Sequence, residues 1–156
     1  AGLVMVSPSP CYIDDGDYVG GFRRTDIEEL LDSLDSNYLG WSHAIAPTII
    51  GNPGEPADEL EASFCRVDPA IARQFARVTF LSDNRSDLAD ISVPTLVLQC
   101  AHDAIAPRCV GEYVHEHVPG SRLQLLDVAG HCPNLSAPAD TAAAIRIFLD
   151  GLDALT

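Results

Sequence analysis

The chain has 156 residues, of which 47% are hydrophobic, and this is sufficient for one domain with a buried core. Its formal net charge of −14 and its scattered basic residues argue against nucleic acid and anionic membrane as partners, because both bind clustered Lys and Arg. No apolar stretch approaches the roughly 18 residues that a membrane-spanning helix needs, so we expect no membrane association.

The N-terminal part of the chain predicts a buried strand followed by a loop and a helix. Residues 2–6 are apolar throughout, which is typical of a strand buried on both faces, as in a parallel sheet. Residues 14–21 are rich in Asp and Gly, which indicates a loop. Thr25 with Glu28 three positions later matches a capping box, and apolar residues at helical spacing follow.

Three further helices are predicted before residue 82. They cover residues 37–50, 57–65 and 69–81, and Asp68 is expected to cap the last of them, with Pro69 at its first position. This helical block, residues 25–82, interrupts a strand–helix series. We interpret it as a lid, because ligands bind at the carboxyl ends of the strands in α/β sheets.

After Pro94 the pattern alternates between strands and helices. Strands are predicted at residues 95–101 and 123–128, and helices at residues 107–118 and 137–152. The fold class is therefore α/β, with three parallel strands, flanking helices and an inserted four-helix lid. In this division residues 1–24 form a core strand and the connection to the lid, and residues 83–156 form the C-terminal half of the core.

Two candidate catalytic residues follow the second and third strands. Asp103 comes just after one strand and His131 just after the next, in the order acid then histidine that an α/β-hydrolase triad requires. Gly130 permits tight backbone geometry before His131, and Pro133 stiffens the loop after it. Taken singly, Asp103 could be a helix N-cap and His131 an ordinary loop histidine. Together they predict a general base, His131, that is oriented by Asp103.

The chain offers only poor candidates for the nucleophile. Ser42 lies in a Gly-x-Ser-x-Ala sequence, but a nucleophile elbow needs a preceding strand, and this serine falls in a predicted helix. Cys132 is adjacent to His131, and neighbouring side chains do not easily reach attack geometry. We therefore expect the nucleophilic serine upstream of Ala1, and no activity from this chain alone.

Other reactive side chains give weaker signals. His115 and His117 lie on different faces of a predicted helix, so neither a metal site nor a cofactor is predicted. Asp127 is the first alternative to Asp103 as the triad acid. The five cysteines contain no CxxC pair, from which we expect reduced, mostly buried thiols and a cytoplasmic protein.

Several segments resemble one branch of the α/β-hydrolases, which contains the bacterial stress regulator RsbQ and the plant strigolactone and karrikin receptors. The matching segments include Ser7-Pro-Ser-Pro-Cys-Tyr12, Tyr18-Val-Gly-Gly-Phe22, Asn37-Tyr-Leu-Gly-Trp41 and Gly130-His-Cys-Pro133. The resemblance implies a hydrolase core with a V-shaped four-helix lid over a mostly apolar pocket. It also implies that Asp103 and His131 are the triad acid and base, and that the serine and much of the oxyanion hole precede Ala1.

Aromatic residues concentrated near the lid are candidates for the pocket wall. They are Tyr12, Phe22, Trp41, Phe75 and Phe80. The leading functional hypothesis is a serine hydrolase that acts on a small, largely apolar ester or lactone. The alternative, drawn from the same resemblance, is a ligand-dependent stress-signalling regulator with slow hydrolysis, whose lid contacts a regulatory protein partner.

Overall fold

The core of the molecule is a parallel three-stranded sheet with the strand order β1-β2-β3. The computed structural model describes residues 1–51 and 54–153. The strands are β1 (Leu3–Val6), β2 (Thr95–His102) and β3 (Arg122–Ala129). In the register, Leu3 pairs with Thr95 and Leu96 pairs with Arg122. The predicted α/β class and its three parallel strands are confirmed.

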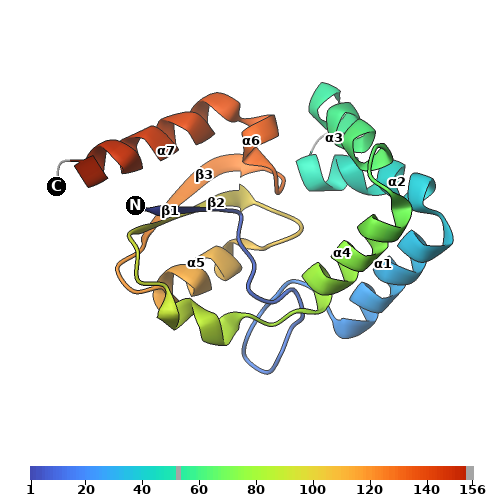
Figure 1. Cartoon of the computed structure of the whole chain (residues 1–156), viewed down its shortest axis with the longest axis horizontal. Helices are drawn as coiled ribbons and strands as arrows, with labels where there is room; N and C mark the ends of the chain where they lie inside the picture. The colour runs from blue at the N-terminus through green and yellow to red at the C-terminus, as the bar shows by residue number, and fades with distance from the viewer. Residues whose placement is uncertain (52–53, 154–156) are drawn as a thin grey trace.

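Strand β2 lies between β1 and β3, and its side chains are buried on both faces of the sheet. Val97 packs on one face against Val114 and Val118, at the end of helix α5 (Arg108–His117). Leu98 packs on the other face against Phe148 of helix α7 (Pro138–Asp153). Figure 1 shows α5 and α7 on opposite sides of the sheet. Alternating side chains of one strand therefore join two helical layers.

Four helices lie between β1 and β2 in the sequence, as predicted. They are α1 (Arg24–Ser36), α2 (Tyr38–Ile50), α3 (Glu55–Cys65) and α4 (Pro69–Leu81). The helices pack on one another, α2 against α3 and α1 against α4 and α2, and they stand to one side of the sheet (Figure 1). Helix α2 also contacts the short helix α6 (Pro133–Ser136), which follows β3. This side of the sheet is the one where β2 and β3 end.

The ends of these helices differ in part from the prediction. Asp68 caps α4 as expected, and its carboxylate accepts hydrogen bonds from Ala70 and Ile71. The predicted capping box of Thr25 with Glu28 is wrong. The N-cap of helix α1 is Arg23, two residues before Thr25, and the capping carboxylate belongs to Asp26, which accepts from the backbone N–H and the guanidinium of Arg23. The predicted terminal helix, residues 137–152, is observed as α7, and the short helix α6 precedes it. A short 3₁₀ helix, η1 (Arg85–Asp90), precedes β2.

The cysteines are all unpaired, but most of them are not buried. Cys11 and Cys100 are buried, Cys132 is half-buried, and Cys65 and Cys109 are exposed. The expectation of mostly buried thiols is therefore wrong, because the two exposed thiols lie on solvent-facing helix positions. Among residues 1–51 and 54–153, no helix combines the length and the apolarity that a bilayer crossing requires.

Candidate active site

Asp103 and His131 meet at the carboxyl end of the sheet. Asp103 follows β2 and His131 follows β3 with one glycine between, and these neighbouring parallel strands end at the same edge. His131 Nδ1 lies 2.8 Å from Asp103 Oδ2. The Asp103 side chain is fully buried, whereas that of His131 remains 19% exposed. The predicted contact between the two side chains is confirmed.

The Asp103 carboxylate is held by backbone donors as well as by the imidazole. Its Oδ1 accepts hydrogen bonds from the N–H groups of Ile105, at 2.8 Å, and Ala106, at 3.0 Å. Asp103 is not the N-cap of α5, since Pro107 occupies that position. The roles in this pair follow the histidine tautomer: opposite an ionised carboxylate, which can only accept, the donor is Nδ1–H. Nε2 of the same ring is then free to take up a proton.

The backbone around His131 is fixed by contacts with β2 and α2. Gly130 has φ +90°, and a Cβ at this position would lie 2.0 Å from the carbonyl oxygen of Ile50. Gly130 N–H donates to His102 O at 3.0 Å, and His131 N–H donates to Ile49 O at 2.6 Å. Glycine is therefore required at position 130 both for its backbone conformation and for the close approach of α2.

Burial keeps the reactive groups around the carboxylate neutral. It raises the pKa of the Cys132 thiol and of the Tyr12 phenol, and the negative charge of Asp103 raises both further. The pKa of Cys100 is raised mainly by burial as well. A thiol needs its thiolate form to act as a nucleophile, so these shifts disfavour Cys132 in that role.

Two serines that could suggest a nucleophile are both engaged elsewhere. Ser42 is fully buried in α2, and its Oγ donates to Tyr38 O at 2.9 Å. Ser7, which the sequence did not single out, ends β1 with φ +45°, and its Oγ lies 3.6 Å from Cys100 Sγ. No pattern in the sequence predicts the positive φ of Ser7.

The two histidines of α5 point to different partners. His115 Nδ1 lies 2.8 Å from Ser121 Oγ, and His117 Nδ1 lies 2.8 Å from Tyr113 O. In the part of the chain that the structure describes, no group of three or more His, Cys, Asp or Glu side chains is arranged to hold a metal ion.

The structure gathers four of the five candidate pocket aromatics in one apolar cluster. Tyr12 is buried there, with Phe22, Trp41 and Phe80 packed around it half-buried. The rings of Tyr12 and Phe80 lie 5.0 Å apart. Phe75 is separate from them, with 70% of its surface exposed.

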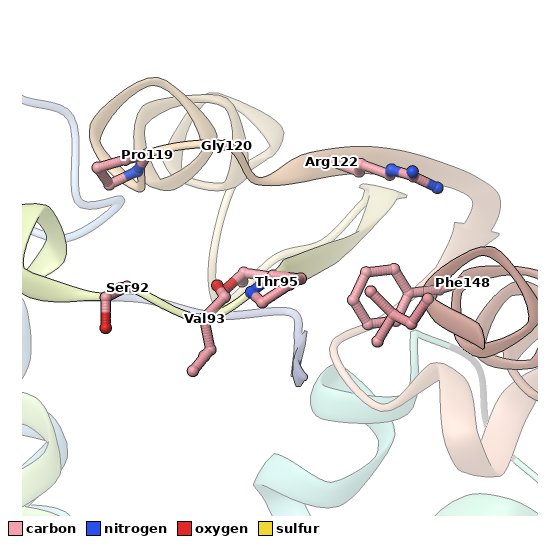
Figure 2. Close-up of a pocket in the computed structure, with 9 residues that line it drawn as sticks. Ser92, Val93, Thr95, Pro119, Gly120, Arg122 and Phe148 are labelled. Carbon is pink, nitrogen blue, oxygen red and sulfur yellow. The ribbon is translucent and has the colours of Figure 1, made fainter. Parts of the chain in front are cut away.

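Two cavities of the molecule are lined by residues other than these five aromatics. A cavity of about 320 Å³ opens at the amino ends of β2 and β3, where Thr95, Arg122 and Phe148 line it (Figure 2). A second, of about 400 Å³, lies between the loop at Tyr18 and Tyr113 of α5. Neither is lined by Asp103 or His131, which lie at the other end of the sheet from the first.

Comparison with known proteins agrees with this geometry. Residues 1–144 match the model of the Alpha/beta hydrolase family. The chain belongs to this family. It is 36% identical over 146 residues to a strigolactone esterase from Arabidopsis thaliana, covering 92% of this chain and 55% of that protein. It is 35% identical over 142 residues to a karrikin insensitive 2 receptor from Petunia hybrida, covering 89% of this chain and 52% of that protein.

A solved structure extends the family match. The chain superposes on a hydrolase from Oleispira antarctica with a TM-score of 0.87 and 42% identity, covering 94% of this chain and 55% of that one. The chain spans about half the length of the curated relatives it matches. The resemblance to the branch of strigolactone and karrikin proteins is thus confirmed.

Proposed function

We propose that this chain is part of a serine hydrolase in which Asp103 orients His131 as the general base. The observation that carries the proposal is the 2.8 Å contact between a fully buried carboxylate and a partly exposed imidazole. Ser42, which lies in the elbow-like sequence, is buried in a helix and engaged with Tyr38, and we place the nucleophilic serine in a part of the full-length protein outside these 156 residues.

In the proposed reaction the serine attacks the carbonyl carbon of an ester. His131 Nε2 takes the serine proton, and Asp103 stabilises the imidazolium that forms while remaining ionised itself. His131 then returns the proton to the leaving alcohol, and the acyl-enzyme remains. A water molecule repeats the same sequence, with His131 again as base and then acid, and releases the carboxylic acid.

We further propose that residues 25–82 are the lid of the active site. Helix α2 reaches the His131 loop, where Ile49 O accepts the His131 N–H, which supports this assignment. The apolar cluster that contains Tyr12, Trp41 and Phe80 would form one wall of the substrate pocket. Phe75, which is exposed, would line another side of that pocket. Such a wall suits a small, largely apolar ester or lactone.

A second candidate function is ligand-dependent signalling with slow hydrolysis. The similarity to a karrikin receptor favours it. Exposed apolar residues at helical spacing on α4, namely Ile71, Phe75 and Val78, would offer a regulatory protein partner a contact surface on the lid. In either case a cytoplasmic location is proposed, since all five cysteines are unpaired.

A serine-directed fluorophosphonate probe tests the proposal in the full-length protein. We expect labelling of one serine, located by mass spectrometry, and strongly reduced labelling in a His131→Asn variant. Labelling that does not depend on His131 would refute the proposed role. The turnover of an aryl ester then separates the two functions: steady fast turnover supports the enzyme, and slow turnover that changes with a partner protein supports the regulator.

A further inference from the structure

A glutamine is completely buried beside the candidate site. Gln99 lies on β2, four positions before Asp103, and is 0% exposed. It points to the same face of the sheet as Val97, towards α5, because side chains two apart on a strand share a face. Burial of an amide is unfavourable unless its polar atoms find partners, so the contacts of Gln99 call for an explanation.

The amide of Gln99 holds the loop that carries the carboxylate. Gln99 Nε2 donates to Ala106 O at 2.9 Å. Ala106, itself fully buried, donates its N–H to Asp103 Oδ1 at 3.0 Å. Both polar groups of one peptide residue are thereby fixed, the carbonyl by Gln99 and the N–H by Asp103. A continuous series of contacts runs from Gln99 to the His131 ring.

Helix α5 is shaped to accept this amide. A Cβ at Gly111 would lie 2.6 Å from Gln99 Oε1 and 2.7 Å from its Cγ. A glycine inside a helix is otherwise unfavourable, and the space that Gln99 occupies accounts for it. Gln99 Oε1 is buried without a hydrogen-bond partner in the described structure, a cost that an apolar side chain at this position would avoid.

We propose that Gln99 is a positioning residue that, through Ala106, keeps Asp103 in place to hold the His131 ring. The expected effect of Gln99 on turnover rests on the proposed function, whereas its expected effect on the His131 ring does not. The buried Oε1 of Gln99 has no hydrogen-bond partner in the described structure, which costs stability. Unfavourable features of this kind are commonly found where a site needs a fixed geometry, which is consistent with this role.

The test compares Gln99→Met with Leu98→Met in the full-length protein. Both changes place methionine on β2, but Leu98 packs on the opposite face of the sheet from Gln99, against Phe148 of α7. Nitrogen NMR of the ring, at a pH where free histidine is neutral, reports the tautomer of His131. We expect only the Nδ1–H tautomer in the unchanged protein and in Leu98→Met, and a mixture of tautomers in Gln99→Met. In Gln99→Met, the kcat for an aryl ester should fall about tenfold while KM stays unchanged.

A second pair of variants keeps the inference testable if Gln99→Met fails to fold. Gly111→Ala should displace the Gln99 amide and produce the same mixture of tautomers, although Ala normally favours a helix. In a Gln99→Ala background, Gly111→Ala should add less, because the close contacts with Oε1 and Cγ are gone and only the one with the Cβ at position 99, at 2.8 Å, remains.

The two proposals fail differently. A folded Gln99→Met protein that keeps a single Nδ1–H tautomer and full turnover would overturn the role of Gln99. If the tautomer responds as expected, but turnover is indifferent to Gln99→Met and to Asp103→Asn alike, the role of Gln99 stands and the hydrolase assignment of the pair fails.

Discussion

The backbone N–H of His131 donates a 2.6 Å hydrogen bond to the carbonyl oxygen of Ile49, at the end of α2. The candidate base is thus attached by its side chain to β2, through Asp103, and by its backbone to the helical block between β1 and β2. A displacement of α2 would move the His131 backbone while Asp103 stays with the sheet. The position of the helical block and the geometry of the candidate site are therefore linked at one residue.

This junction predicts an unusually large effect of Gly130→Ala. A Cβ at position 130 would lie 2.0 Å from Ile50 O, and φ is +90°. Gly120 is a matched control, since its φ is +68° but nothing lies within 4 Å of the Cβ position. We expect Gly120→Ala to lower the free energy of unfolding by about 1–2 kcal/mol, the cost of a left-handed Ala. Gly130→Ala should lower it by at least about 2 kcal/mol more in denaturant titrations. Equal losses would contradict the close approach of α2.

Substitution of the acid separates the two candidates that the sequence offered. Asp103→Asn in the full-length protein should leave the fold intact and lower the turnover of an aryl ester by about 10⁴, because it favours the wrong histidine tautomer. Asp127→Asn should leave turnover unchanged, since the Asp127 side chain is 98% exposed and lies 3.8 Å from the imidazole of His102 rather than beside His131. The reverse ranking of the two variants would move the acid to Asp127.

The raised pKa of Cys132 predicts slow alkylation at neutral pH. Burial and the charge of Asp103 favour the protonated thiol, and only the thiolate reacts with iodoacetamide. The modification rate of Cys132, followed by peptide mass spectrometry, should therefore rise as the pH is increased into the alkaline range. Cys65, which is exposed, serves as an internal reference that should react faster at neutral pH. Equal rates for the two thiols at neutral pH would show that Cys132 is not protected.

Arg85 contacts the loop after β1, and its removal should lower the stability of the fold. Arg85 Nη2 lies 2.7 Å from Asp15 and 2.6 Å from Asp83, and its guanidinium lies 4.7 Å from the centroid of the Tyr18 ring. Arg85→Met should lower the free energy of unfolding by about 1–2 kcal/mol, whereas Arg23→Met, at an exposed pair, should lower it less. Equal costs would contradict the role of the Tyr18 contact.

The contacts of Arg85 also predict how its contribution to stability changes with pH. The hydrogen bond from Arg85 lowers the pKa of Asp83, so its contribution is complete above the ordinary carboxyl pKa of about 3.9. It is lost as the pH falls through the lowered value. The stability difference between the unchanged protein and Arg85→Met should therefore shrink in acid. A difference that persists unchanged well below pH ~3 would exclude Asp83 as its source.

Local patterns were sufficient to predict most elements of the fold. The apolar run of β2 and the Asp68-Pro69 start of α4 are encoded in neighbouring residues, and both are observed. The contact of Asp103 with His131 was also predictable, because consecutive parallel strands end at one edge. The start of α1 was predicted wrongly, since Arg23 is the N-cap and the capping carboxylate three residues later is Asp26 rather than Glu28.

The features that the sequence did not predict depend on residues far apart in the chain. The approach of Gly130 to Ile50 joins positions 80 residues apart, and no local pattern at either residue specifies the other. The same holds for Gln99 and Gly111, where a buried amide and a helix glycine are explained only by each other. Phe75, expected at a pocket wall, is exposed on α4 and its role stays a prediction.

The most direct test of the central claim is the turnover of an aryl ester by the full-length protein with His131→Asn, measured beside a circular dichroism spectrum. The side chain of His131 is partly exposed, so the substitution should leave the fold intact. If His131 is the base that Asp103 orients, the variant should lose turnover by at least about 10⁴-fold. A folded variant that retains turnover within about tenfold of the unchanged protein would contradict the account.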